Sequence, residues 1–317
     1  KKFLIYNMNY KLIILIIFIF FVFLKNKNKN NKIDKWEHLQ NDNYFNNFNA
    51  FDLKFRGCSS KENCKQKYID NVYSFTSEEE QYIVKIIENL NNLIDFRYRK
   101  IFGEINFIKV DNKIESSMPH TRGNNIILSK NWISNMIQKF KKNPKDLVFP
   151  KLLAHEQFHI FQRNNKSLMD ELYSKYWNLV KYDKPLPIEI LEINRTNPDA
   201  LPNINWLFRI DKTTLILPLC VYSKDSNSLR DTQNIYIRLD NNLKFIDLKT
   251  DLDERKLLIN LDSFRKYFGE ESANNYHPNE LSSSLFEIVI EEEVSGNFKN
   301  STNGFNKLKK FLHKYIN

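Results

Sequence analysis

An uninterrupted apolar run opens the chain. Residues 12–24 are all apolar, with Lys11 before them and lysines interleaved with Asn after them. A helix needs about 20 apolar residues to span a bilayer, so the run would have to extend into residues 3–10. No small-residue cleavage pattern follows the run, which favours an uncleaved single-pass anchor at residues 3–24. A cleaved signal peptide, and hence secretion, is the alternative.

Polar residues replace the apolar run directly after it. Residues 25–49 are rich in Asn and Lys, a composition typical of a flexible tether. We place the boundary after residue 35: residues 1–35 hold the anchor and tether, and residues 36–317 form one folded domain. Its packed part is expected to begin near Phe51.

Helical spacing of apolar residues dominates the first half of this domain. From Ser77, several glutamates precede apolar positions three and four apart, which predicts an amphipathic helix with an acidic first turn. Residues 131–140 and 147–163 also predict helices. Ser167 can cap a further helix that runs to about Tyr182.

Strand-like segments occur before and after these helices. Residues 105–110 and 125–129 predict strands, separated by a polar stretch. Residues 184–249 contain several prolines among short runs such as 214–219 and 235–239, so we expect loops and sheet there. The chain thus combines helices with sheet, which predicts an α+β fold.

Two helices are expected near the C-terminus. One follows Pro278, a residue suited to the first helical position. Residues 307–316 predict a basic amphipathic helix, which we interpret as a surface helix with an apolar underside and not as a membrane-binding segment.

Composition narrows the class of protein. Apolar residues make up 42% and Gly is scarce, which is typical of a packed globular protein. The excess of Lys, Asn, Ile and Phe resembles the product of an AT-rich genome, such as that of a giant virus or a protist. The net charge of +10 suits an anionic partner. We expect no specific nucleic-acid partner, because the basic residues form no stripe with interleaved aromatics.

The three cysteines do not form a disulfide framework. Cys58 and Cys64 lie close enough in sequence to bridge, and Cys220 lies in an apolar run, where a small buried side chain is expected. There is no CxxC pair, which argues against a zinc site made of cysteines.

The predicted helix at residues 147–163 carries the most specific chemical pattern. His155, Glu156 and His159 form an HExxH motif. Positions i and i+4 lie about 40° apart around a helix, so both imidazoles can bind one metal ion. Glu156 can then act as general base on the water that zinc activates. By chance, a chain of this His and Glu content would contain the motif with an expectation on the order of 0.007.

The motif resembles that of the zincin metallopeptidases, and most closely the gluzincin group. The metzincin extension does not follow His159. The resemblance implies a zincin-like catalytic domain with an active-site helix and a mixed sheet. It also implies Zn²⁺ as cofactor and a third metal ligand from a downstream helix. It places that ligand at Glu280, with Ser284 four residues later as an outer partner. Glu271, Glu287 and His277 are the alternatives for the third ligand.

Three further residues are candidates for the same site. His120 and Arg122 precede the strand at residues 125–129, which has the place of the zincin edge strand that pairs with extended substrate. Both can approach the cleft, and an ordinary polar turn is the alternative. Asp199 can orient an imidazole of the metal site, or it simply belongs to a tight turn.

These patterns together predict a membrane-anchored, zinc-dependent metallopeptidase-like hydrolase that acts on a peptide or protein substrate. The alternatives are a catalytically inactive zincin scaffold that acts as an interaction or virion/membrane-surface protein, and a module that binds nucleic acid or anionic lipid through its charge. The latter would lose affinity steeply with salt.

Overall fold

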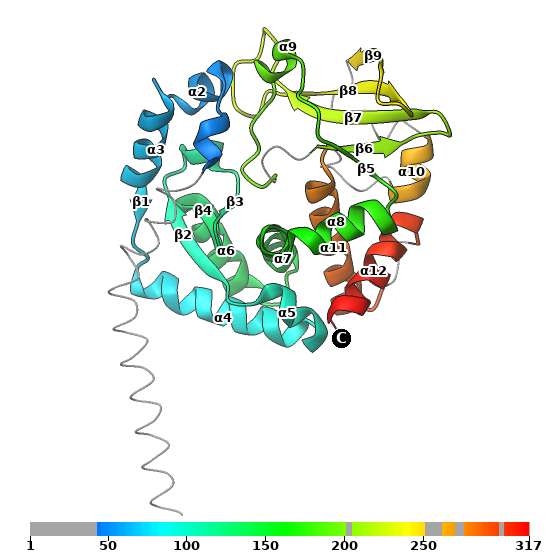
Figure 1. Ribbon diagram of the computed structural model, residues 1–317. Coiled ribbons are helices and arrows are strands. Elements are labelled where there is room, and N and C mark those ends of the chain that lie inside the picture. Colours follow the sequence, from blue (N-terminus) through cyan, green and yellow to red (C-terminus); the bar gives the residue numbers. More distant parts are fainter. Residues whose placement is uncertain (1–42, 201–204, 251–261, 270–275, 298–300, 317) are drawn as a thin grey trace, which may run out of the picture. The chain divides into compact units, whose positions relative to one another are not determined.

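The computed structural model describes residues 43–200, 205–250, 262–269, 276–297 and 301–316 (Figure 1). The expected anchor at residues 3–24 and the alternative ligand Glu271 lie outside these residues. None of the helices in the described ranges is both long and apolar enough to cross a membrane. The fold is α+β, with one mixed and one antiparallel sheet.

The mixed sheet has the strand order β1-β2-β4-β3. Its strands are β1 (Val72–Tyr73), β2 (Asn106–Val110), β3 (His120–Arg122) and β4 (Asn125–Ser129). The apolar runs predicted as strands form β2 and β4, which pair in parallel at the centre. The expectation that residues 125–129 form the edge is wrong. A turn at Gly123, with φ of 54°, returns the chain so that β3 pairs antiparallel with β4 and becomes the edge strand.

Helices surround the mixed sheet. They are η2 (Phe96–Tyr98), α4 (Ser77–Leu93), α5 (Arg99–Phe102), α6 (Lys130–Lys142) and α7 (Val148–Asn164). Thr76 caps α4 in a capping box with Glu79, and the Ser129 hydroxyl caps α6. Both α6 and α7 contact the sheet. The predicted helices at Ser77, 131–140 and 147–163 are therefore confirmed.

The second sheet is antiparallel throughout, in the order β5-β6-β7-β8-β9. Its strands are β5 (Val180–Tyr182), β6 (Asn205–Arg209), β7 (Thr214–Val221), β8 (Gln233–Asp240) and β9 (Phe245–Thr250). The expectation of sheet and loops between residues 184 and 249 is confirmed, with one short helix, α9 (Ile188–Leu191), among them. The predicted helix from Ser167 to Tyr182 is wrong at both ends. Asn165 precedes α8 (Lys166–Glu171), which continues as the π-helix η4 (Leu172–Tyr176), and the chain then enters β5.

Three helices complete the C-terminal part: α10 (Asp262–Phe268), α11 (Pro278–Ser295) and α12 (Asn303–Ile316). Pro278 starts α11 as predicted, with His277 at the N-cap. The underside of α12 is buried, including Phe305, Leu308 and Phe311, as expected for a surface helix. Helix α11 packs along α7, where the rings of Phe158 and Phe286 stack with centroids 4.7 Å apart.

The folded part extends further towards the N-terminus than Phe51. The segment η1 (Asn43–Asn47) precedes α2 (Ala50–Arg56) and α3 (Lys61–Asp70), and buries Tyr44 and Phe45. Cys58 and Cys64 form a disulfide between α2 and α3, and Cys220 is buried, both as expected. The short helix η3 (Ile114–Ser117) lies against α2.

Candidate metal centre

Two helices bring the candidate ligands together. On α7, the spacing of four places His155 and His159 on one side of the helix. On α11, Glu280 lies in the first turn. Since α7 and α11 pack against each other, all three side chains meet in the domain interior, where they are 8%, 1% and 5% exposed.

The ligand atoms converge on one point. His155 Nε2 lies 3.0 Å from His159 Nε2, and these atoms lie 3.5 Å and 3.6 Å from Glu280 Oε2. Ligand atoms bound tetrahedrally to zinc at about 2.0–2.1 Å stand about 3.3 Å from one another. The three observed separations bracket that value, so the residues fit an ion of this size. Across the described part of the chain, this is the cluster of His, Cys, Asp and Glu that could hold a metal.

The far side of the His155 ring is held by a carboxylate. Its Nδ1 lies 2.6 Å from Oε1 of Glu287, which stands about two helical turns beyond Glu280 on α11. A carboxylate at Nδ1 fixes the ring orientation and leaves Nε2 free to bind a metal. The sequence offered Glu287 only as an alternative ligand, and the structure places it at the outer nitrogen.

The His159 ring is oriented by an amide. Its Nδ1 lies 3.0 Å from Gln162 Oε1 and 3.2 Å from the Ser283 hydroxyl. Gln162 Nε2 donates to the Asn279 carbonyl at 2.9 Å, so the amide oxygen is the atom turned towards the ring. The imidazole must then donate from Nδ1, and its Nε2 lone pair faces the centre. Sequence reasoning missed Gln162, although its position one turn after His159 was a usable signal.

An asparagine from another segment fixes the Glu280 carboxylate. Asn197 Nδ2 donates to Glu280 Oε1 at 2.5 Å and to the Tyr276 hydroxyl at 2.6 Å. With Oε1 held in this way, Oε2 is the oxygen directed at the two imidazoles. Sequence reasoning did not identify Asn197, because no local pattern links it to a helix more than 80 positions away.

Glu156 lies beside the cluster without joining it. Its side chain is buried, and Oε2 has no hydrogen-bond partner among the described residues. Burial, followed by the negative charge of Asp199, raises the pKa of Glu156 to about 8. An oxygen without a partner and a pKa near neutral are the features of a carboxyl that can exchange a proton with water, as a general base must.

The three converging groups also perturb one another. Burial opposes protonation of His155 and His159, but the pKa of each imidazole is raised because Glu280 lies close by. Burial disfavours the charged form of Glu280, yet the two imidazoles hold its pKa well below the usual range. The site therefore favours positive charge at its centre.

His120 and Arg122 lie on the edge strand and not in a turn. Both are buried. His120 Nδ1 lies 3.0 Å from the Met118 carbonyl, and Arg122 Nη1 donates to the Pro198 carbonyl at 2.8 Å.

The remaining candidates have other partners. Asp199 Oδ1 accepts hydrogen bonds from Thr121, while the outer nitrogens of the imidazoles are held by Glu287 and Gln162. His277 Nδ1 accepts from the Asn279 backbone as the N-cap of α11. Ser284 is partly buried, and it is the preceding residue, Ser283, that reaches an imidazole.

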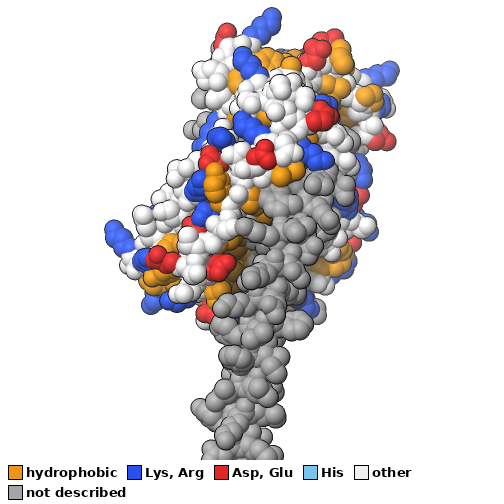
Figure 2. Space-filling model, turned by 90° about the vertical axis from the view of Figure 1, so that its left-hand side faces the viewer, with side chains coloured by type: hydrophobic (Ala, Val, Ile, Leu, Met, Phe, Trp, Pro, Cys, Tyr) orange, Lys and Arg blue, Asp and Glu red, His pale blue; other side chains and the backbone are white. Residues whose placement is uncertain are grey.

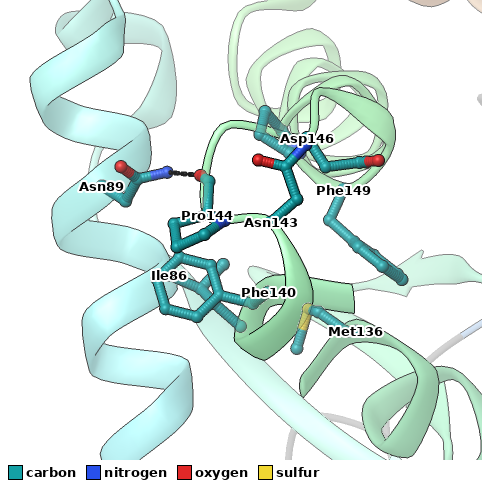
Figure 3. Close-up of a pocket in the computed structure, with 9 residues that line it drawn as sticks. Ile86, Asn89, Met136, Phe140, Asn143, Pro144, Asp146 and Phe149 are labelled. Carbon is teal, nitrogen blue, oxygen red and sulfur yellow. Dashed lines mark hydrogen bonds between the residues drawn. The ribbon is translucent and has the colours of Figure 1, made fainter. Parts of the chain in front are cut away.

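A small apolar pocket lies elsewhere in the domain. It is formed between α4, α6 and the start of α7, and is lined by residues such as Ile86, Phe140 and Phe149 (Figure 3). Asn89 closes one side through a hydrogen bond to the Pro144 carbonyl. None of the converging residues lines this pocket, so it offers no route to them.

Comparison with known proteins adds no relative. No family model matches the chain, and neither a curated protein nor a solved structure matches it. The resemblance to zincins therefore rests on residues of α7 and α11. Function has to be argued from the geometry and chemistry of those side chains.

Proposed function

We propose that this protein is a zinc-dependent metallopeptidase-like hydrolase with a zincin-like fold, anchored to a membrane through residues 3–24. The observation that carries the proposal is the convergence of His155 Nε2, His159 Nε2 and Glu280 Oε2 at separations of 3.0–3.6 Å, with Glu156 beside them. Two imidazoles and one carboxylate leave a position open on the metal, which is typical of catalytic and not of structural zinc sites.

The charges of the site also favour a divalent cation. Glu156 and Glu280 are both less than 9% exposed, and buried carboxylates are costly unless a cation neutralises them. Nitrogen and oxygen donors in this combination suit zinc better than magnesium or calcium, which prefer oxygen ligands alone. Zinc, when bound, would supply Lewis acidity and make water a better nucleophile near neutral pH.

In the proposed reaction, one residue transfers the proton and others position the metal ligands. Glu156 takes the proton of the attacking water at its carboxylate and delivers it to the leaving amine. Glu287 and Gln162 hold the two imidazoles, and Asn197 holds Glu280. Their hydrogen bonds fix the ligand atoms before any substrate arrives, which lowers the reorganisation needed for reaction.

Metal content tests the first part of the proposal. The full chain, purified without chelator and shown to be folded, should contain about one zinc per chain by atomic absorption. Less than about a tenth of an equivalent would remove the metal hypothesis.

Replacement of Glu156 tests the catalytic part. Glu156→Gln keeps the shape of the side chain but removes the proton acceptor, so turnover of a peptide library should fall by about 10²–10⁴ with zinc content unchanged. Glu189→Gln, at an exposed position on α9, is the matched control and should retain activity. Zinc without turnover in the unmodified protein would instead favour an inactive scaffold that binds a partner.

Binding through net charge alone is less well supported. On the face shown in Figure 2, Lys and Arg side chains are scattered among Asp and Glu and do not gather into a stripe. A module that binds nucleic acid presents a continuous basic surface.

A further inference from the structure

Residues 195–199, called the strap here, cross from the antiparallel sheet to the candidate metal centre. In Figure 1 the chain that follows α9 runs from that sheet towards α7 and β3. The strap makes hydrogen bonds to the edge of β3, to the third candidate ligand and to the N-terminal helices, and its first residue, Arg195, also donates to the Cys220 carbonyl. Each contact bears on what the strap does.

At β3, the strap accepts a hydrogen bond from a backbone N–H that points away from β4. Asp199 Oδ1 accepts from the Thr121 backbone N–H at 2.7 Å and from the Thr121 hydroxyl at 2.6 Å. Arg122 donates to the Pro198 carbonyl from the same strand. Since β4 pairs with the other side of β3, this edge is the one on which an extended peptide could add as a further strand.

At the candidate metal centre, the strap contacts a site that is buried. Asn197 contacts Glu280 directly, and Pro198 and Asp199 are buried. His155, Glu156 and His159 are 8%, 4% and 1% exposed. A polypeptide substrate has to reach these residues, so the conformation described is a closed one.

The N-terminal helices hold the strap in this place. Arg56 Nη2 donates to the Thr196 carbonyl at 3.1 Å, and the Thr196 backbone N–H lies 3.3 Å from Asp52 Oδ2. The Thr196 hydroxyl donates to the Asn47 carbonyl at 3.1 Å. Segments more than 100 residues away in sequence thus fix the strap at Thr196.

We propose that the strap is a built-in competitor of the substrate: Asp199 occupies the Thr121 backbone position to which an extended peptide binds, and the site opens when the strap leaves β3. This inference rests on the proposed peptidase function. It makes the closed protein a latent form whose activity is set by how firmly residues 195–199 are held.

The test weakens the strap at β3 and leaves the candidate ligands unchanged. In the zinc-loaded full chain, Asp199→Ala should speed the removal of zinc by the chelator 1,10-phenanthroline, and should raise kcat/KM on a peptide library, each by about tenfold for the loss of hydrogen bonds of ordinary net strength. Asp170→Ala, which removes an exposed carboxylate paired with Lys181, is the control and should change neither.

A readout without metal separates this inference from the proposed function. Hydrogen exchange of the Thr121 amide should be faster in Asp199→Ala than in the unmodified protein, whether or not zinc is bound. If the protein binds no zinc but exchange rises, the peptidase proposal fails and the strap contact stands.

Two results would overturn the inference. Unchanged zinc removal and unchanged exchange would show that Asp199 does not close the site, and loss of turnover with zinc removal unchanged would make Asp199 part of the catalytic machinery. If Asp199→Ala does not fold, Thr121→Val preserves the branched shape and removes the hydroxyl that donates to Asp199 and accepts from Arg163, while the backbone bond to Asp199 remains. It should shift zinc removal and kcat/KM in the same direction by a smaller factor, and no shift would count against the strap.

Discussion

Two groups of buried charged side chains in this domain differ in how their charges are satisfied. In the first, called the ionic cluster here, Arg56 lies between Asp52 and Glu115 at 2.6 Å and 2.8 Å. Tyr44 and Tyr68 also donate to Glu115, so its carboxylate is saturated by protein donors. At the candidate metal centre, by contrast, three acceptor atoms face one another at 3.0–3.6 Å.

The difference separates a structural cluster from a candidate site. Opposite charges that pair off in the interior are complete without a ligand. Acceptors that converge on one point repel one another unless protons or a cation lie between them. Burial of charge is common to both regions of this protein, and the convergence of acceptor atoms is what distinguishes the candidate metal centre.

The largest expected effect is on zinc binding, when one of the three converging side chains is removed. Glu280→Ala should weaken zinc binding by more than about 1,000-fold, because an outer partner of a metal ligand contributes only about 10–100-fold. Glu287→Ala removes such an outer partner and the same charge from α11, so its effect should fall in the smaller range. Competition with a chelator at fixed pH measures both. Equal losses would mean that Glu280 is no ligand, and a larger loss for His277→Ala would indicate a site of three histidines.

A smaller effect is expected from breaking the ionic cluster. Arg56→Met leaves Asp52 and Glu115 buried without their cation, which should lower the free energy of unfolding by about 3–5 kcal/mol. The partly exposed pair of Arg97 and Asp95 is the control, and Arg97→Met should cost about 0–1 kcal/mol. Urea denaturation measures both variants. If Arg56→Met lowers the free energy of unfolding as little as the control does, the ion pairs of the ionic cluster do not contribute to stability.

The smallest expected effect is the dependence of stability on pH through Glu115 of the ionic cluster. Burial raises the pKa of Glu115, but the charges of Arg56 and His120 and the hydrogen bonds from Arg56 and Tyr44 together hold that pKa below its usual range. A carboxyl with a depressed pKa stabilises the fold above the pKa of the unfolded chain, about 4.3 for Glu, and this stabilisation is lost as pH falls through the folded value.

Glu115→Gln tests this dependence. The unmodified protein should lose more unfolding free energy than the variant when urea denaturation is repeated at pH values from about 5 down to about 3. Parallel pH profiles for the two proteins would show that Glu115 is not the group that titrates.

The two helices that hold the candidate centre could be predicted from local sequence patterns. The HExxH spacing and the apolar pattern around it predicted the helix that became α7, and Pro278 marked the start of α11. The structure brings Glu280 to the two histidines, as the resemblance implied. Its role as a ligand stays a prediction.

Contacts between distant segments could not be predicted in this way. Asn197 reaches Glu280 from a loop, and Asp199 reaches Thr121 across 78 positions. The edge strand β3 depends on a turn at Gly123 inside a stretch that resembled a polar loop. The helix predicted from Ser167 ended early because the π-helical turn at Leu172–Tyr176 gave way to a strand that pairs with β6. Each of these outcomes is decided by tertiary pairing, which overrides local propensity.

The hydrogen bonds of Gln162 determine whether the His159 side chain loses its conformational entropy on folding or on metal binding. Its amide links the His159 ring to α11 through the Asn279 carbonyl and the hydroxyls of Ser282 and Ser283. The imidazole is therefore oriented when the two helices pack, and the conformational entropy is lost on folding, before an ion arrives. Metal uptake should then change the heat capacity little, in contrast to small zinc domains that fold only around their ion.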